Sequence, residues 1–233
     1  MAHAAGGAAH VELSFDPVKA VARLRRVDRE LGRVIKQAGP FTHRPEKMQS
    51  PFQTLFRAIV YQQLSGKAAA TIMGRVMANY PKRSFSPKTV LATSDHVFRK
   101  AGMSRAKVMS VKDLAAKTID GAVPTLARLV KMGDEEIISR LVEVRGIGVW
   151  TVEMLLIFRL GRPDVLPVSD FGVRKGFMLT YGLKDLPSGK QMLDHGERWR
   201  PFRSVASWYL WRAVELSRNA ETNGKKSPGK AGG

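Results

Sequence analysis

The chain has 233 residues, of which 44% are hydrophobic and 25% are charged. This length and composition suit one large globular unit or two smaller lobes with a substantial core. The chain has no cysteine, which excludes disulfides, thiolate zinc sites, iron–sulfur clusters and cysteine nucleophiles. No apolar run approaches the roughly 20 residues of a membrane span, and the first residues lack the pattern of an export signal. We therefore expect a soluble protein that is not exported and has no membrane partner.

The charge of the chain is strongly basic. Lysine and arginine number 39 against 20 aspartates and glutamates, a formal net charge of +19. An excess of this size indicates a polyanionic partner, and nucleic acid is the leading candidate. Association with the ribosome and a generally basic surface are the alternatives.

The first strong helical pattern follows an Ala/Gly-rich start, residues 1–15, which we expect to be a flexible tail. Asp16 and Pro17 predict an N-cap and first helical position, and Gly39-Pro40 ends the pattern. The apolar face comprises Val18, Val21, Leu24, Val27, Leu31 and Val34. The opposite face is basic; it is either a nucleic-acid contact or, more commonly, a solvated surface.

A second helix begins at Pro51 and is interrupted by the polar stretch Tyr61-Gln62-Gln63 before a further helical pattern. The break indicates either a loop facing a partner or a simple helix corner with Ser65 as N-cap. The two interpretations are evenly balanced.

Short helices fill the next 60 residues. We expect them around residues 95–101 and 105–119, capped by Ser94 and Ser104, then one from Pro124 and one from Asp134. Nothing alternates with period two for long, so the predicted fold class is all-α.

The segment Arg145-Gly146-Ile147-Gly148 separates two apolar helical patterns. Glycine permits positive φ and a close approach of the backbone to an outside group. Consecutive amides at the start of the helix expected near Val149 form an anion site suited to phosphate. An ordinary turn between helices is the alternative.

After this turn an apolar helix ends at Gly161 and Pro163, and an extended stretch leads to Asp170. Asp170 starts a helix that contains Phe171, Val173, Phe177, Met178 and Leu179 and stops at Gly182. Asp170 by itself favours a simple N-cap, a role that Ser169 could fill instead. Ser188 is expected to cap a short helix, Pro201 precedes the last helix, and residues 221–233 are expected to be a disordered basic tail.

Four stretches in this order, YQQLSGKAA, VRGIGVWTVEMLL, LPVSDFGVRKG and RWRPFRSVASWYLWRA, resemble the helix-hairpin-helix DNA glycosylase superfamily. The resemblance covers most of residues 45–218 and is closest to the alkylbase branch, the 3-methyladenine DNA glycosylase II type. It implies one unit over residues 16–220 with two helical lobes, residues 45–160 and residues 16–44 plus 161–220, and a DNA-binding and active-site cleft between them. It also implies a monomer acting on damaged duplex DNA, nucleoid-associated in the cytoplasm of a bacterium or nuclear in a eukaryote.

The resemblance places the catalytic carboxylate at Asp170. A fixed anion stabilises the oxocarbenium-like sugar formed during glycosidic cleavage, or acts as base for the attacking water. The base pocket that it implies would offer aromatic faces to a cationic alkylated base, although core packing is the alternative role of its tryptophans. Its members are Trp150, Trp211, Met154, Trp208 and Tyr61. Met154 replaces a tyrosine of the bacterial branch.

Trp150 also holds the position at which bifunctional relatives carry a lysine nucleophile, so the resemblance implies a monofunctional enzyme without lyase activity. It assigns the wedge that fills the space of the extruded base to Gln63, flanked by Leu64 and Ser65 in the minor groove, whereas chemistry alone favours Leu64.

The remaining implied contacts are with the DNA backbone. The phosphate contacts are Arg145, Gly146, Ile147, Gly148, Arg174 and Lys175. The charged members could instead be solvated surface residues. No cofactor is required, although the carbonyls of Val142, Val144 and Ile147 match those that hold a structural Na+ or K+ in relatives.

Two other functions remain open. A noncatalytic helix-hairpin-helix protein would keep the phosphate contacts without base release. An endonuclease-type repair enzyme acting at mismatches is disfavoured because the lysine and cysteines are missing. Which of 3-methyladenine, 7-methylguanine, ethenoadenine and hypoxanthine is preferred does not follow from the sequence.

Overall fold

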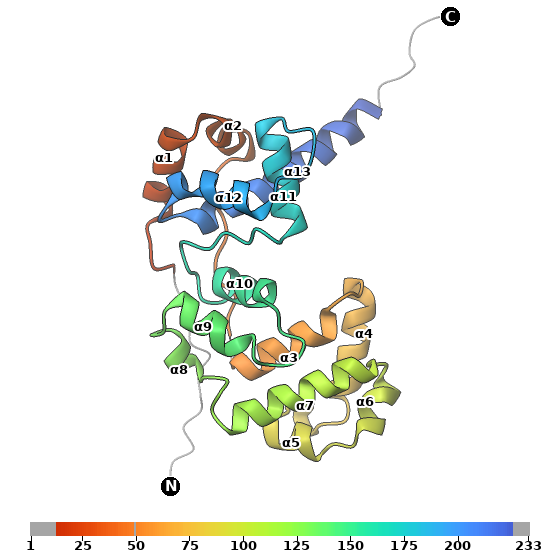
Figure 1. Ribbon diagram of the computed structural model, residues 1–233. Helices are drawn as coiled ribbons and strands as arrows, with labels where there is room; N and C mark the ends of the chain where they lie inside the picture. Colours follow the sequence, from red (N-terminus) through yellow and green to blue (C-terminus); the bar gives the residue numbers. More distant parts are fainter. Residues whose placement is uncertain (1–12, 49, 226–233) are drawn as a thin grey trace, which may run out of the picture. The chain divides into compact units, whose positions relative to one another are not determined.

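The computed structural model describes residues 13–48 and 50–225. Over these residues the chain forms helices α1 to α13 and two short 3-10 helices, with no strand (Figure 1). The all-α prediction is confirmed. None of the described helices is long and apolar enough to cross a membrane.

The described chain divides into two compact units. Unit 1 is Glu46–Leu155, and unit 2 comprises residues 13–45 and 156–225. The division falls inside helix α10 (Val149–Phe158), between Leu155 and Leu156, whereas the sequence placed it after Leu160. Each unit has its own core.

Unit 1 is organised around α3 and α7. Leu55, Phe56 and Ile59 of α3 and Val111 and Leu114 of α7 are fully buried. Helix α7 packs against α3 and also against α5. The elements are α3 (Pro51–Tyr61), α4 (Gly66–Met77), η1 (Pro81–Arg83), α5 (Pro87–Ala92), α6 (Asp95–Ala101), α7 (Arg105–Ile119), α8 (Leu126–Leu129), α9 (Asp134–Leu141) and the start of α10.

Unit 2 is built on the last helix, which packs against α11 and α2. A Cβ on Gly176 of α11 would lie 2.0 Å from the carbonyl oxygen of Leu210, so only glycine allows these two helices to approach so closely. The elements are α1 (Pro17–Val27), α2 (Arg29–Ala38), the end of α10, α11 (Phe171–Tyr181), α12 (Gly189–Gly196), η2 (Glu197–Trp199) and α13 (Arg203–Lys225).

The helix predicted from Pro17 to Val34 is two helices, because Asp28 interrupts it. Asp28 is extended, with φ −145°, and its Oδ1 caps α2 through the N–H of Leu31 at 3.0 Å. Its Oδ2 accepts from Tyr181 Oη at 2.6 Å and Trp199 Nε1 at 2.9 Å, and lies 2.9 Å from His195 Nε2. A buried carboxylate requires such partners, and they come from residues too distant for the periodicity to reveal.

The ends of the described chain also differ from the prediction. Phe15, placed in the flexible tail, packs against the rings of Phe41 and Phe202 with centroids 6.3 and 5.8 Å apart. Helix α13 continues to Lys225, into the predicted disordered segment. The rest of both predicted tails, residues 1–12 and 226–233, lies outside the described residues.

Most predicted helix starts are confirmed by side-chain caps. Ser65, Ser104 and Ser188 accept hydrogen bonds from backbone N–H groups at the starts of α4, α7 and α12. Ser94 precedes α6 without such a bond, and α8 starts at Leu126 rather than at Pro124.

Candidate functional site

The segment between α9 and α10, residues 142–148, is the glycine hairpin. Gly146 has φ +78°, and a Cβ there would lie 2.6 Å from Ser110 Oγ of α7. The N–H of Ile147 donates to Val144 O at 3.0 Å, and the Ile147 side chain is buried. Gly146 is therefore required by both the backbone conformation and the packing.

Gly148 differs from the prediction because it has no positive φ. It directly precedes α10, and its carbonyl accepts from the N–H of Thr151 at 3.0 Å. A Cβ at Gly148 would meet no atom within 4 Å. The fold itself thus does not require glycine here, and the open space leaves the start of α10 accessible to an outside group.

Helix α7 supports this hairpin from inside unit 1. The N–H of Arg145 donates to Asp113 Oδ2 at 2.7 Å. Lys117 forms an ion pair with the same carboxylate at 3.2 Å and donates to the carbonyl of Glu143. These contacts fix the hairpin backbone, while the side chain of Arg145 remains exposed.

The α3–α4 loop, residues 62–65, contains the predicted wedge. Gln63 has φ +56°, a left-handed conformation that costs a non-glycine residue roughly 1–2 kcal/mol. Gln63 and Leu64 are both exposed, and Ser65 caps α4 through the N–H of Ala68 at 3.3 Å. The helix corner considered from the sequence is therefore present, and it turns the two candidate wedge residues toward solvent.

Asp170 is the N-cap of α11. Its Oδ1 accepts from the N–H of Val173 at 2.8 Å and from Nε1 of Trp211 at 2.9 Å. Ser169 is exposed and does not take the cap, so that alternative is wrong. Two donors on one oxygen fix the orientation of the carboxylate relative to α11 and α13.

Gly172 makes this arrangement possible, which the sequence analysis missed. A Cβ on Gly172 would lie 2.7 Å from Cδ1 of Trp211 and 3.1 Å from Oδ1 of Asp170. The glycine two residues after the aspartate is the only local signal in the sequence, because the indole that requires it comes from residue 211.

Trp211 also lines a pocket of about 320 Å³ within unit 2, together with Phe158, Gly172, Trp208 and residues of α13. The rings of Phe158 and Trp211 are 5.4 Å apart at an angle of 35°. Trp208 is buried and packs edge-on against Phe41 at 5.1 Å, so core packing accounts for most of its surface. The lining combines these three aromatic rings with the charged residues Arg212, Glu215 and Arg218, and Trp211, which lines the pocket, is bonded to Asp170.

The other predicted base-pocket residues lie in unit 1. Trp150 is 45% exposed in the first turn of α10, and Met154 is half-buried one turn later on the same face. Tyr61 ends α3 beneath the guanidinium of Arg57, which lies 4.1 Å from the ring centroid. The structure thus brings Asp170 together with Trp211 and Trp208 in unit 2, and Trp150 together with Met154 in unit 1.

The residues that follow Asp170 do not all lie on the faces of α11 that the sequence predicts. Phe171, assigned to its apolar pattern, is 65% exposed and presents an aromatic ring next to Asp170. Arg174 donates to the carbonyl of Pro187 at 3.0 Å, a contact within unit 2. Lys175 lies 3.9 Å from the sulfur of Met178.

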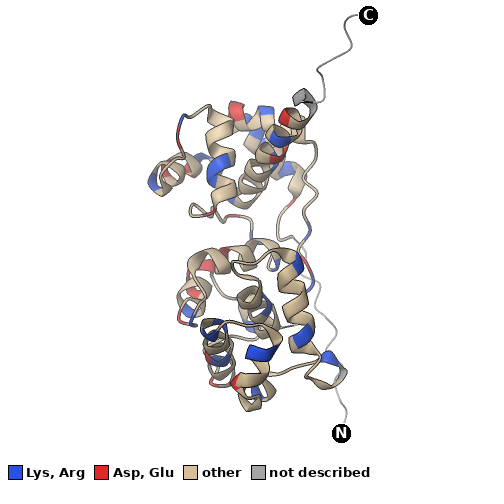
Figure 2. Cartoon of the chain, turned by 90° about the vertical axis from the view of Figure 1, so that its right-hand side faces the viewer, with Lys and Arg blue, Asp and Glu red and all other residues tan. Residues whose placement is uncertain are grey.

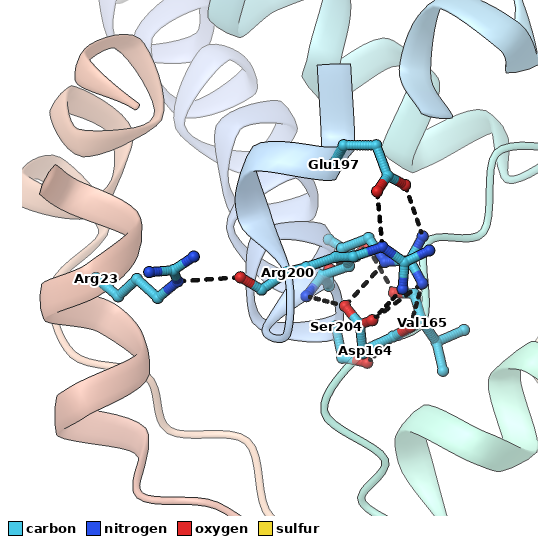
Figure 3. A network of polar contacts seen from close by, with 8 residues as sticks. Arg23, Asp164, Val165, Glu197, Arg200 and Ser204 are labelled. Atoms are coloured by element: carbon cyan, nitrogen blue, oxygen red, sulfur yellow. Dashed lines mark hydrogen bonds and ion pairs between the residues drawn. The ribbon is translucent and has the colours of Figure 1, made fainter. Parts of the chain in front are cut away.

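An ion-pair network fixes the extended stretch that leads to Asp170 (Figure 3). Asp164 accepts from Nε and Nη2 of Arg203 at 2.8 and 3.1 Å and from Arg200 at 2.6 Å. Ser204 donates its N–H to Pro163 O at 2.9 Å, and its hydroxyl accepts from Val165 at 2.9 Å. The stretch is therefore tied to the start of α13, the helix that carries Trp211.

The predicted cation ligands are carbonyls of the glycine hairpin. The carbonyl of Val144 already accepts the N–H of Ile147, but its second lone pair leaves it able to bind a cation. The neighbouring carbonyls of Glu143 and Gly146 accept from side chains of Lys117 and Gln62. Carbonyl oxygens are the ligand type that Na+ and K+ accept, and the described residues contain no group of three or more His, Asp or Glu able to hold another metal.

A model of the HhH-GPD superfamily of base excision DNA repair proteins matches residues 56–201. The chain belongs to this superfamily. It is 36% identical over 208 residues to DNA-3-methyladenine glycosylase 1 of Schizosaccharomyces pombe, with 88% of this chain and 91% of that protein covered. The family named from four sequence motifs is thereby confirmed.

Solved structures give the same HhH-GPD fold. A 3-methyladenine DNA glycosylase of Schizosaccharomyces pombe in complex with abasic DNA is 36% identical, has a TM-score of 0.75, and covers 85% of this chain and 98% of its own. A DNA-3-methyladenine glycosidase from Bacillus halodurans is 33% identical, with a TM-score of 0.77 and 89% and 93% coverage. These similarities extend over both units.

Proposed function

We propose that this HhH-GPD protein is a DNA glycosylase that hydrolyses the N-glycosidic bond of alkylated purines extruded from duplex DNA. The observation that carries the proposal is the carboxylate of Asp170, which Val173 and Trp211 orient next to a pocket lined in part by aromatic rings. Relatives named as DNA-3-methyladenine glycosylases support 3-methyladenine as a substrate. We propose 7-methylguanine with it because it is an alkylated purine of the same kind.

Asp170 would act on the sugar. Departure of the base leaves positive charge on C1′ and the ring oxygen, and a carboxylate held nearby lowers the free energy of that transition state. The same carboxylate accepts a proton from the attacking water. The N–H of Trp211 keeps the carboxylate in place without neutralising it.

The leaving base needs little help from an acid. An N-alkylated purine carries a formal positive charge, so it leaves without strong protonation. The indole face of Trp211 offers such a cation up to about 2 kcal/mol when it is desolvated. Phe158, stacked beside Trp211, extends this aromatic wall.

The reaction would stop at the abasic site. Trp150 occupies the start of α10, where a lysine would be needed to form a Schiff base with the sugar. An indole has no such nucleophile. The DNA strand is therefore left intact, which makes the enzyme monofunctional.

Binding to the duplex would use unit 1 and the basic charge of both units (Figure 2). The open backbone at Gly148 accommodates a phosphate, and Arg145 adds an exposed cation next to it. Lys175 and Arg174 add basic charge near Asp170. Catalysis needs no cofactor; a Na+ or K+ held by hairpin carbonyls would bridge the backbone to phosphate.

The experiment is identification by mass spectrometry of the bases released from a panel of duplexes, each with one lesion. Wild type should release 3-methyladenine or 7-methylguanine, and Asp170→Asn should bind the same duplex without releasing base. Asp16→Asn is the matched control, since Asp16 caps α1 in the same unit. Full activity of Asp170→Asn overturns the assignment. Duplex binding with steep salt dependence but no release by wild type indicates the noncatalytic alternative, and strand scission without alkali indicates an endonuclease.

A further inference from the structure

The α3–α4 loop and the glycine hairpin are joined by a direct hydrogen bond. Nε2 of Gln62 donates to the carbonyl of Gly146 at 2.8 Å, across 84 residues of sequence. This bond connects the segment that contains the wedge residues with the segment that contains the phosphate site. The two segments lie in the same unit.

Side chains of helix α7 form hydrogen bonds with both segments. Nζ of Lys107 donates to the carbonyls of Val60 and Gln62, each at 2.7 Å, and so completes the C-terminal end of α3. Three and ten residues further along α7, Ser110 contacts Gly146 and Lys117 donates to Glu143. This spacing places the three side chains on one stripe of the helix.

Gln63 is the residue that these contacts constrain. The left-handed backbone of Gln63 directly follows Gln62, whose side chain is bonded to the hairpin. The carbonyl of Gln62 is also bound by Lys107, as is that of Val60. A non-glycine residue keeps such a conformation only where its surroundings impose it. The two adjacent glutamines therefore point in different directions: the side chain of Gln62 points toward the hairpin, and that of Gln63 points toward solvent.

We propose that Gln62 and Lys107 are positioning residues, which lock the α3–α4 loop to the glycine hairpin so that wedge insertion and phosphate binding occur in fixed register. The inference rests on the proposed function, since a wedge matters only if a base is extruded from a duplex. Extrusion costs a few kcal/mol of unstacking. A loop that is already ordered adds no further ordering cost to that step.

The test compares base release from duplex and single-stranded DNA that carry the same lesion, because single strands need no wedge. Gln62→Glu keeps the size of the side chain and removes its N–H donor. The matched control is Gln53→Glu, since Nε2 of Gln53, also on α3, donates to a different carbonyl, that of Phe85, at 3.3 Å.

A second matched pair lies on α7. Lys107→Met removes the bonds to the end of α3. Lys112→Met removes equivalent bonds to the end of α5, where Nζ of Lys112 donates to the carbonyls of Leu91 and Thr93 at 2.9 and 2.5 Å. Each variant loses one ammonium group that donates to the last carbonyls of a helix. Only the helix bound by Lys107, α3, is followed by the loop that contains the proposed wedge.

We expect Gln62→Glu and Lys107→Met to lower the duplex rate by up to about tenfold, the upper range for the net loss of one hydrogen bond, and to leave the single-strand rate within about twofold. Gln53→Glu and Lys112→Met should leave the ratio of the two rates unchanged. Equal falls in both rates, or no fall at all, overturn the inference.

A spectroscopic readout separates this inference from the proposed function. A 2-aminopurine placed beside an abasic-site analogue brightens when the wedge unstacks it, whether or not catalysis occurs. Gln62→Glu should lose this signal while Gln53→Glu keeps it. If wild type releases no base, the proposed function fails, and the fluorescence still decides whether Gln62 positions the loop.

Discussion

The indole N–H of Trp211 donates to Oδ1 of Asp170 at 2.9 Å, and the N–H of Val173 donates to the same oxygen at 2.8 Å. Asp170 is thus both the cap of α11 and the partner of a residue on α13. The carboxylate is held by the fold before any substrate arrives, which is the preorganisation that electrostatic catalysis requires.

Trp211→Phe should lower kcat for base release because it keeps an aromatic face but removes the Nε1–H that orients Asp170. Loss of a hydrogen bond to a charged group is worth about 1.5–3 kcal/mol, or roughly 10- to 100-fold in rate. Single-turnover kinetics measures the effect. In an Asp170→Asn background the same change should have little further effect, and additive losses in that double-mutant cycle would contradict the orienting role.

Gly148→Ala should weaken duplex binding about tenfold, which is about 1.4 kcal/mol, because a methyl group would occupy the space proposed for phosphate. The fold offers no obstacle to that methyl group, so the melting temperature should change little. Gly133→Ala is the matched control, since Gly133 precedes α9 and also has no atom within 4 Å of an added Cβ. Titration of labelled duplex by fluorescence anisotropy is the measurement. Equal affinity of the two variants would remove Gly148 from the interface.

Stability should fall in acid through Asp28. Burial raises the pKa of Asp28, but hydrogen bonds from His195, Tyr181, Leu31 and Trp199 outweigh burial and hold this pKa well below its usual range. Because the folded pKa lies below the unfolded one, the stabilisation is complete above about pH 4 and is lost as the pH falls further.

Asp28→Asn should therefore destabilise the protein by about 3–5 kcal/mol at neutral pH and flatten the acid limb of the stability profile. Urea unfolding from pH 3 to pH 7 measures both effects. Asp16→Asn, a change at an exposed cap, should cost little, because asparagine caps helices about as well as aspartate. Parallel acid limbs for wild type and Asp28→Asn would show that other carboxylates control acid unfolding.

Local features of this fold could be read from the sequence, because they depend on neighbouring residues. Ser104 and Ser188 cap helices as expected, Ser65 caps α4 as in one of the two interpretations of that break, and Gly146 has the positive φ of a turn glycine. The four motifs sufficed to recognise the family because their order reflects the whole fold. Asp170 and Trp211 were named as site residues through that resemblance, and their hydrogen bond places them together in unit 2.

What the sequence could not provide depends on contacts between distant residues. Asp28 splits the first helix, and the sequence did not reveal this because the partner of its carboxylate, His195, is 167 residues away. Phe171 fits the apolar period of α11 yet is exposed, since no other element of its unit covers that position. From the sequence, Lys107 is one of many basic residues expected at the surface. The structure shows that its ammonium group donates to a carbonyl at the end of α3.

The double role of Asp170 has a consequence for the evolution of such chains. Asparagine and serine cap helices about as well as aspartate, so a mutation at this position would leave α11 and the melting temperature nearly intact. Selection for folding alone would therefore not preserve the carboxylate, whereas selection for the proposed catalytic role would. If Asp170 is catalytic as proposed, a duplicated copy of this gene could lose catalysis in a single step and persist as a stable protein that still binds damaged DNA.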